Sequence, residues 1–294
     1  MTRLLSQLMA CAVTLALLAA PAQAEKLKAV ASFSILGDMV QQVTGDLASV
    51  TTIVGPDADA HVYTPNVNDA RAVTEADVIF VNGLGFETWS KTLIDTSGTK
   101  AKVYIATESM TPLKVDGETD PHAWNALTNG VIYVQNIAKA LAEVDPKNAK
   151  TYETNAAAYI AELEAVHKHT VAELAALPKD RRTVVTAHDA FGYLANAYGL
   201  RFLAPVGIDT EAEPSAQQLA KLIDQLKGEE VAGLFVENIT SLALVQQISK
   251  ETGLKVGGRL FSDALSVKGG PATSYLAMFE HNLGVILAAL KGQS

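Results

Sequence analysis

The sequence predicts an α/β fold: two α/β lobes with parallel sheets, joined by one long connecting helix. Short runs rich in β-branched residues alternate with amphipathic helical runs in both halves of the chain, as in the βα units of a parallel sheet. Between the halves, residues 147–177 keep helical character, with no Gly or Pro before Pro178. At ~1.5 Å of rise per residue this stretch would be ~45 Å long, which is enough to run the height of a two-lobed molecule.

The first lobe, residues 25–146, is expected to alternate strands with helices. Gly45 ends the first helical run and Pro65 opens the second, as these residues commonly do at helix ends. The run 77–83 is almost continuously apolar, which is typical of a strand buried on both faces of a parallel sheet. The expected strands are 26–34, 48–55, 77–83 and 101–107, and the expected helices are 35–45, 64–76, 86–97 and 130–145.

The second lobe, residues 178–294, repeats the alternation after the connecting helix of residues 147–177. A Gly-rich loop at 266–270 separates its last strand from its last helix. The expected strands are 182–188, 201–207, 231–238 and 255–261, and the expected helices are 189–199, 215–230, 241–253 and 272–291.

Residues 1–24 have the layout of a secretory signal peptide. Arg3 precedes an apolar stretch that ends in Ala-Gln-Ala, so we expect cleavage after Ala24 and a mature protein in the periplasm. The "LMAC" segment ending at Cys11 resembles a lipoprotein box, but most of the apolar run follows it, so we do not expect lipidation. No later segment reaches the ~18 apolar residues of a membrane span.

Composition excludes several classes of function. Cys11 is the one cysteine of the chain and lies in the expected signal peptide, so we expect no disulfide, thiolate ligand or cysteine nucleophile in the mature protein. A net charge of −9 argues against a nucleic-acid partner, which requires a basic face. No nucleophile elbow, P-loop or dinucleotide-binding glycine motif occurs, so we do not expect an enzyme.

Three of the six histidines follow expected strands. His61, His122 and His188 each fall at or just beyond a strand end, and Asp263 follows the strand 255–261. Ligands of open parallel sheets gather at the carboxyl ends of the strands. A single histidine in such a place is more often a loop hydrogen-bonding residue, but four positions, two in each lobe, predict one cleft between facing lobes.

The other histidines and the prominent aromatic residues have structural interpretations. His167 and His169 are two residues apart in the connecting helix and therefore point to different faces. His281 lies in the last helix, at a position that we expect to be at the surface or at a cap. For the aromatic residues Trp89, Trp124 and Tyr193 we expect packing roles.

Four segments resemble a known family. The motifs "DAHVYTP", "DPHAW", "TAHDAFGY" and "FSDALS" look like the metal-site segments of the periplasmic zinc- and manganese-binding solute-binding proteins of metal ABC importers. The resemblance covers nearly the whole mature chain in order. It implies two α/β lobes bridged by one long helix, with a metal site in the interlobe cleft. It also implies that His61, His122, His188 and Asp263 are the metal ligands.

The resemblance favours zinc. Manganese-selective members typically carry Glu at the third ligand position, where this chain has His188. Three imidazoles and one carboxylate suit tetrahedral zinc, whereas manganese prefers more oxygen ligands and higher coordination. Many zinc-type relatives have a long His-rich loop before the second ligand; here the segment before His122 contains no histidine.

The function implied is capture of one Zn²⁺ per monomer in the periplasm and delivery to the membrane permease of a zinc ABC importer with its cytoplasmic ATPase. Whether a periplasmic metallochaperone loads the site stays open. Each imidazole must be neutral to bind, so affinity should fall below pH ~6.5, and Glu237 is a candidate for holding a ligand imidazole. The alternatives are a manganese or mixed zinc and manganese carrier, a zinc-dependent hydrolase, and an adhesin in which the metal is structural.

Overall fold

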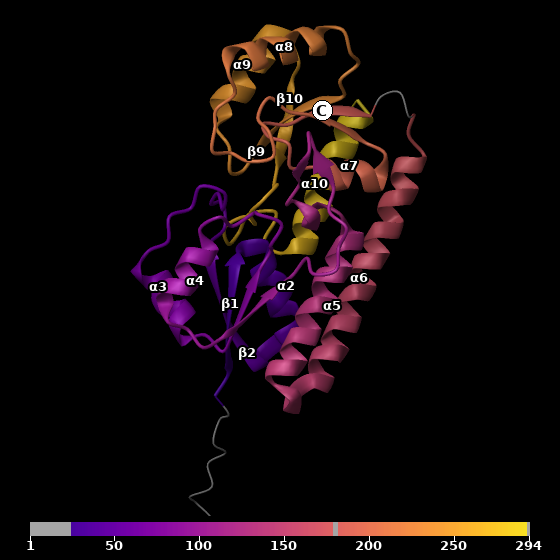
Figure 1. Ribbon diagram of the computed structural model, residues 1–294. Coiled ribbons are helices and arrows are strands. Elements are labelled where there is room, and N and C mark those ends of the chain that lie inside the picture. Colours follow the sequence, from indigo (N-terminus) through magenta and orange to yellow (C-terminus); the bar gives the residue numbers. More distant parts are fainter. Residues whose placement is uncertain (1–24, 179–181, 293–294) are drawn as a thin grey trace, which may run out of the picture.

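The computed structural model describes residues 25–178 and 182–292, and it shows two α/β lobes alongside a long helix (Figure 1). This is the fold class predicted from the sequence. The predicted signal peptide and Cys11 lie outside the described residues.

The first lobe is built on a four-stranded parallel sheet of order β2-β1-β3-β4. Its middle strands are buried, in agreement with their apolar sequences. The strands are β1 (Leu27–Phe33), β2 (Ala48–Val54), β3 (Val78–Val81) and β4 (Lys102–Ile105). The helices are α2 (Ser34–Thr44), α3 (Val67–Glu75), α4 (Ser90–Ser97) and α5 (Leu127–Val144), with the 3₁₀ turns η1 (Gly45–Leu47) and η2 (Ala123–Asn125).

The second lobe repeats this topology. Its sheet has the order β10-β9-β7-β8, so in both lobes the first strand lies between the second and the third. The strands are β7 (Thr183–Val185), β8 (Arg201–Leu203), β9 (Gly233–Glu237) and β10 (Val256–Leu260). The helices are α7 (Gly192–Tyr198), α8 (Ala216–Lys227), α9 (Leu242–Thr252) and α10 (Tyr275–Leu290).

Local sequence sets the ends of these helices. Asn66 caps α3 and Ser215 caps α8, and each forms a reciprocal capping box with the residue three positions later. Helices α7 and α9 end where Gly199 and Gly253 adopt left-handed backbone conformations, which glycine does without steric cost. The cap at Asn66 also explains why α3 begins at Val67, three residues later than the sequence predicts.

The long helix α6 (Ala149–Ala175) follows the 3₁₀ turn η3 (Pro146–Asn148) and lies beside α5 along the height of the molecule (Figure 1). It packs against α2 and α5 of the first lobe and against α7 and α10 near the second. One continuous apolar core extends from Phe33 in the first lobe to Phe261 and Tyr275 in the second. This shared core favours limited lobe movement, since opening the lobes would expose apolar surface.

A short hairpin was not predicted from the sequence. Strands β5 (Lys114–Val115) and β6 (Glu118–Thr119) pair antiparallel around an Asp116-Gly117 turn. Both turn residues have positive φ angles, 51° and 93°, which is the geometry that Asp-Gly favours in two-residue hairpins. The sequence predicts that His122 follows the fourth strand. In the structure the hairpin lies between β4 and His122, so the histidine does not come directly after that strand.

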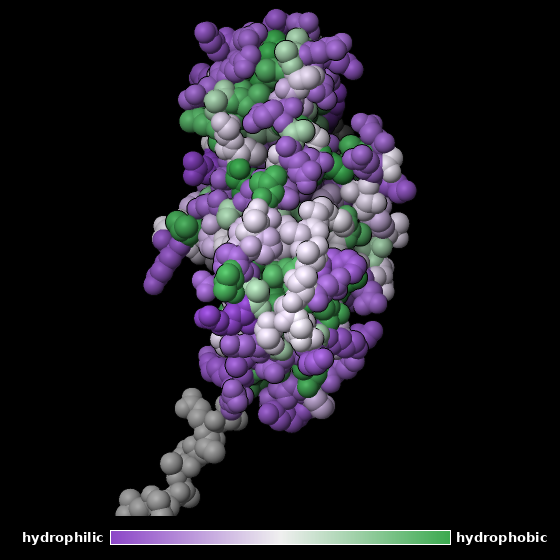
Figure 2. Space-filling view, turned by 60° about the vertical axis from the view of Figure 1, so that its left-hand side comes forward, coloured by the Kyte–Doolittle hydropathy of each residue, from purple (hydrophilic) through white to green (hydrophobic). Residues whose placement is uncertain are grey.

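Hydrophilic residues dominate the outline of the surface. On the face in Figure 2 they predominate at the lower end, the upper end also shows a group of apolar residues among them, and residues of intermediate hydropathy gather across the middle. Among the helices of residues 25–178 and 182–292, none combines the length and the apolar character needed to cross a bilayer.

Candidate metal centre

The four residues singled out in the sequence come together between the lobes. His61 lies in the loop after β2, and His122 immediately precedes η2. His188 lies beyond the end of β7 and forms an isolated parallel bridge with Val206. Asp263 lies three residues beyond β10. Each lobe therefore contributes two side chains, as the sequence predicts.

The donor atoms of these four residues form a compact group. One ligand atom from each lies within 4.8 Å of all the others. The Nε2 atoms of His61 and His122 are 3.3 Å apart. Oδ2 of Asp263 lies 3.3 Å from Nε2 of His61 and 3.2 Å from Nε2 of His188, and Oδ1 lies 3.8 Å from Nε2 of His122.

These atoms are buried and poorly satisfied by protein partners. His122, His188 and Asp263 are 0% exposed and His61 is 6% exposed. Nε2 of His188 and both carboxylate oxygens of Asp263 have no hydrogen-bond partner among the described residues. Buried polar atoms are costly to leave unpaired, so their convergence indicates a site for a cation.

The electrostatics of the group are strongly coupled. Burial lowers the pKa of the His188 imidazole, but the charges of Glu237 and Asp263 outweigh this effect and hold the pKa well above its usual value. Burial raises the pKa of Asp263, but the neighbouring His188 and His122 imidazoles hold it well below its usual range. The site therefore favours a positive charge beside an ionised carboxylate.

Two buried carboxylates orient the imidazoles from behind. Oδ1 of Asp120 lies 2.8 Å from Nδ1 of His122 and also accepts the His122 backbone N–H at 3.0 Å. Oε2 of Glu237 lies 2.5 Å from Nδ1 of His188. In both histidines Nδ1 contacts a carboxylate and Nε2 points to the other donor atoms of the cluster. Carboxylates outside a metal site commonly orient metal-binding histidines in this way. Glu237 was a candidate from the sequence, whereas Asp120 was not identified.

The aromatic residues expected to pack also make specific hydrogen bonds. Trp89 donates to the carbonyl of Ala60, the residue before His61, at 2.8 Å. Trp124 donates to the carbonyl of Ser262, the residue before Asp263, at 2.7 Å.

Tyr193 makes a third such bond, from its hydroxyl to the carbonyl of Asp120 at 3.0 Å. Trp89 and Trp124 therefore hold the backbone next to a donor residue, and Tyr193 holds the backbone of Asp120, whose carboxylate contacts His122. The prediction of packing alone was incomplete.

The remaining histidines lie elsewhere. His167 is half-buried on α6, with Nδ1 2.9 Å from the hydroxyl of Tyr198, and His169 on the same helix is exposed. His281 is half-buried within α10, with Nε2 3.0 Å from the carbonyl of Arg259. It is not at a helix cap.

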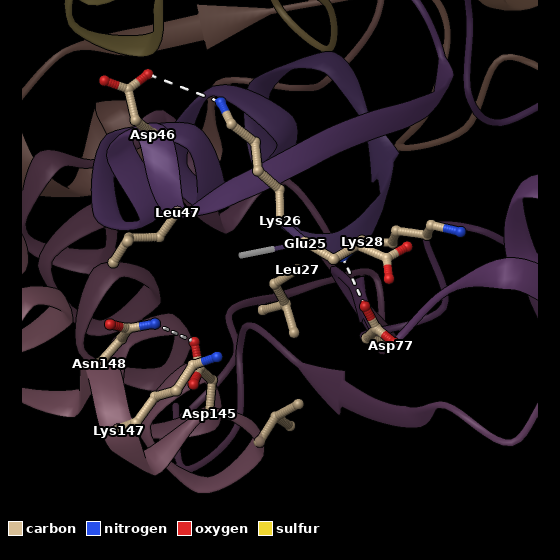
Figure 3. Close-up of a pocket in the computed structure, with 11 residues that line it drawn as sticks. Glu25, Lys26, Leu27, Lys28, Asp46, Leu47, Asp77, Asp145, Lys147 and Asn148 are labelled. Carbon is tan, nitrogen blue, oxygen red and sulfur yellow. Dashed lines mark hydrogen bonds and ion pairs between the residues drawn. The ribbon is translucent and has the colours of Figure 1, made fainter. Parts of the chain in front are cut away.

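A hollow of about 1060 Å³ lies where β1 begins (Figure 3). Its lining mixes lysines with acidic residues. Lys26 lies 4.0 Å from Asp46, and the Asp77 carboxylate accepts the backbone N–H of Lys28 at 2.7 Å. Among the described residues the group of metal-binding donors lies elsewhere, so this hollow is a poorer candidate than the four-residue cluster.

The spacing of the cluster fits a tetrahedral ion. Metal–ligand distances of about 2.0–2.1 Å, typical of zinc with His nitrogen and carboxylate oxygen, give a tetrahedron with edges of about 3.3–3.4 Å. Three separations between donor atoms, at 3.2, 3.3 and 3.3 Å, match that edge, and a fourth, between His122 and Asp263, is longer at 3.8 Å. His61, His122, His188 and Asp263 could therefore hold one such ion if the donors that lie farther apart draw together around it.

Comparison with known proteins gives the family. Residues 29–289 match the family described as "Zinc-uptake complex component A periplasmic". The iron ABC transporter substrate-binding lipoprotein MtsA of Streptococcus pyogenes is 36% identical over 280 residues, which cover 92% of this chain and 90% of that protein.

Solved structures agree with this match. A Mn-bound periplasmic metal-binding protein from Candidatus Liberibacter asiaticus has a TM-score of 0.82 and 32% identity, covering 90% of this chain and 100% of that one. The periplasmic zinc-binding protein TroA from Treponema pallidum has a TM-score of 0.87 and 27% identity, covering 90% and 99%. The chain belongs to the family of periplasmic zinc-uptake components, the metal-binding solute-binding proteins of ABC importers.

Proposed function

We propose that this protein captures Zn²⁺ in the periplasm, one ion per chain, through His61, His122, His188 and Asp263. The observation that carries the proposal is the convergence of three imidazole nitrogens and one carboxylate within 4.8 Å, all buried. A donor set of three nitrogens and one oxygen suits zinc, which is usually four-coordinate in such sites.

The cargo role follows from the family, whose members are substrate-binding proteins of ABC transporters and not enzymes. Such proteins work with a membrane permease and an ATPase. We propose that the partner here is the permease of a zinc importer with its cytoplasmic ATPase, and that the carrier is a monomer. A zinc hydrolase would need a coordination position for water and a nearby base. The cluster instead offers four protein donors to the ion.

Manganese and iron are the alternative cargoes. The names of relatives that are 32–36% identical include iron and manganese proteins, so similarity to relatives does not by itself favour zinc. The side chain at position 188 favours zinc for a chemical reason. Manganese(II) prefers oxygen donors and more than four ligands, and the Glu237 carboxylate behind His188 lies 2.5 Å from the imidazole Nδ1. A carboxylate at position 188 would instead face another carboxylate.

Metal competition on chelator-stripped protein tests the choice of cargo. We expect one equivalent of Zn²⁺ to bind and to resist displacement by excess Mn²⁺ or Fe²⁺, as the order of divalent affinities also predicts for a nitrogen-rich site. Growth on limiting zinc of a strain that lacks only the carrier gene and keeps the permease and ATPase, with and without the restored gene, tests transport separately. Stable retention of Mn²⁺ against equimolar Zn²⁺ would contradict the zinc proposal.

A further inference from the structure

The four donor residues are almost completely buried, with His61 the most exposed at 6%, so an arriving ion must pass between side chains. A small hollow of about 120 Å³ reaches the cluster at His188. At its outer end the wall includes the exposed residues Glu213 and Ser241, and at its inner end it includes the fully buried His188. At roughly 30 Å³ per water molecule it has room for about four waters, or for an ion that keeps part of its hydration shell.

A strap of the second lobe, residues 207–214, covers this hollow. It contains neither helix nor strand, and it runs between the bridge at Val206 and the helix cap at Ser215. Its sequence "GIDTEAEP" has three acids and no Lys or Arg. Of these acids, Glu213 lines the hollow.

One hydrogen bond ties the strap to the first lobe. Oγ1 of Thr210 donates to Oδ2 of Asp59 at 2.6 Å, and the other oxygen of the same carboxylate accepts the His61 backbone N–H at 2.9 Å. Asp59 and Thr210 both line the hollow. The bond therefore closes the hollow beside the loop that presents His61.

We propose that this hollow is the route by which a divalent cation reaches and leaves the four-residue site, with Glu213 attracting the ion and the Thr210–Asp59 hydrogen bond acting as the latch. The hollow is tied to the metal site because His188, one of the four proposed donors and fully buried, is among the residues that line it. The inference rests on the proposed metal site and adds its access path.

The latch makes a kinetic prediction. Neither Thr210 nor Asp59 is one of the four donors, so loss of their hydrogen bond should open the route equally for arriving and departing ions. In Thr210→Val we expect the association and dissociation rates of Zn²⁺ to rise by the same several-fold factor, with Kd unchanged. Stopped-flow mixing with a fluorescent zinc indicator measures both rates. Thr74→Val is the matched control, because the Thr74 hydroxyl bonds only to carbonyls of the first lobe, Ala70 and Ser97, among the described residues.

The negative charge of Glu213 leads to a prediction about ionic strength. Glu213→Gln should slow association at low ionic strength, and the difference from wild type should vanish in high salt, because exposed charges are then screened. Glu211→Gln removes the same charge two residues away, outside the wall of the hollow, and should have a smaller effect.

Unchanged rates in Thr210→Val, or equal slowing by Glu213→Gln and Glu211→Gln, would contradict the route while leaving the metal site intact. Wild-type protein that fails to retain zinc would instead contradict the proposed function itself. The two failures are therefore distinguishable in one set of measurements.

Discussion

Glu237 holds His188 from behind in two ways: Oε2 lies 2.5 Å from the imidazole Nδ1, and Oε1 accepts the backbone N–H groups of Ala187 and His188 at 2.8 and 2.9 Å. The end of β9 therefore fixes both the backbone and the ring of a residue beyond β7. This contact orients Nε2 towards the donor group and keeps a negative charge beside the ring.

Replacing Glu237 should weaken metal binding without removing a ligand. Glu237→Gln keeps an oxygen that can accept the two backbone N–H groups but removes the charge beside His188. Loss of such an outer partner typically costs about 10–100-fold in metal affinity. Competition with a zinc chelator measures the change, and Glu251→Gln on the surface of α9 should leave the affinity as it is.

Zinc binding should release a proton. The charges of Glu237 and Asp263 hold the pKa of His188 well above its usual value, so we expect the ring of the metal-free protein to bind a proton. A ligand imidazole must be neutral, and the ion therefore has to displace that proton. Affinity should fall as pH decreases, and the fall should begin above the ~6.5 of a free histidine.

Calorimetric titration in buffers with different ionisation enthalpies counts the protons released. We expect a count near one in wild type and a smaller count in Glu237→Gln. An affinity that stays constant between pH 8 and pH 6 would contradict the coupling.

Zinc should stabilise the folded protein through the cluster residues alone. A ligand at a thousandfold excess over Kd adds ~4 kcal/mol to the free energy of unfolding. His61→Ala should remove most of that increment, since it deletes one donor at the edge of the core. His167→Ala and His169→Ala on α6 should keep it. Scanning calorimetry with and without zinc decides the ranking, and a full zinc shift in His61→Ala would exclude that residue from the site.

Changing the donor at position 188 should change the preferred metal only if its partner changes too. In His188→Glu the new carboxylate would face Glu237, and the repulsion should weaken both Zn²⁺ and Mn²⁺. In His188→Glu/Glu237→Gln the repulsion is relieved, and the site gains an oxygen donor that manganese favours. We expect the ratio of the Mn²⁺ and Zn²⁺ dissociation constants to fall in the double variant. A wild-type ratio in that variant would mean that position 188 does not set selectivity.

The sequence predicted the fold well because its signals were local. The apolar strands around Ile79, the absence of Gly and Pro in α6, and the glycines that end helices each report on their own neighbourhood. The hairpin at Asp116-Gly117 escaped because its strands have only two residues each, too few to show an alternating pattern.

The four clustered residues could be predicted from the sequence, but most of the residues that hold them in place could not. Asp120 lies two residues before His122, a spacing that lets its carboxylate reach the ring, so it was detectable in principle. The bond from Trp124 to the Ser262 carbonyl joins residues 138 positions apart in different lobes. No local pattern reports such a contact, because it depends on how the lobes face each other.

X-ray absorption at the zinc K edge tests the four-residue site most directly. For protein loaded with one equivalent of Zn²⁺ we predict four nitrogen and oxygen ligands at about 2.0–2.1 Å, with the multiple-scattering signature of three imidazoles. His122→Ala, which removes a fully buried donor, should lose one of these imidazoles. A six-coordinate shell with one imidazole or none, or an unchanged spectrum in His122→Ala, would contradict the assignment of His61, His122, His188 and Asp263 as the metal ligands.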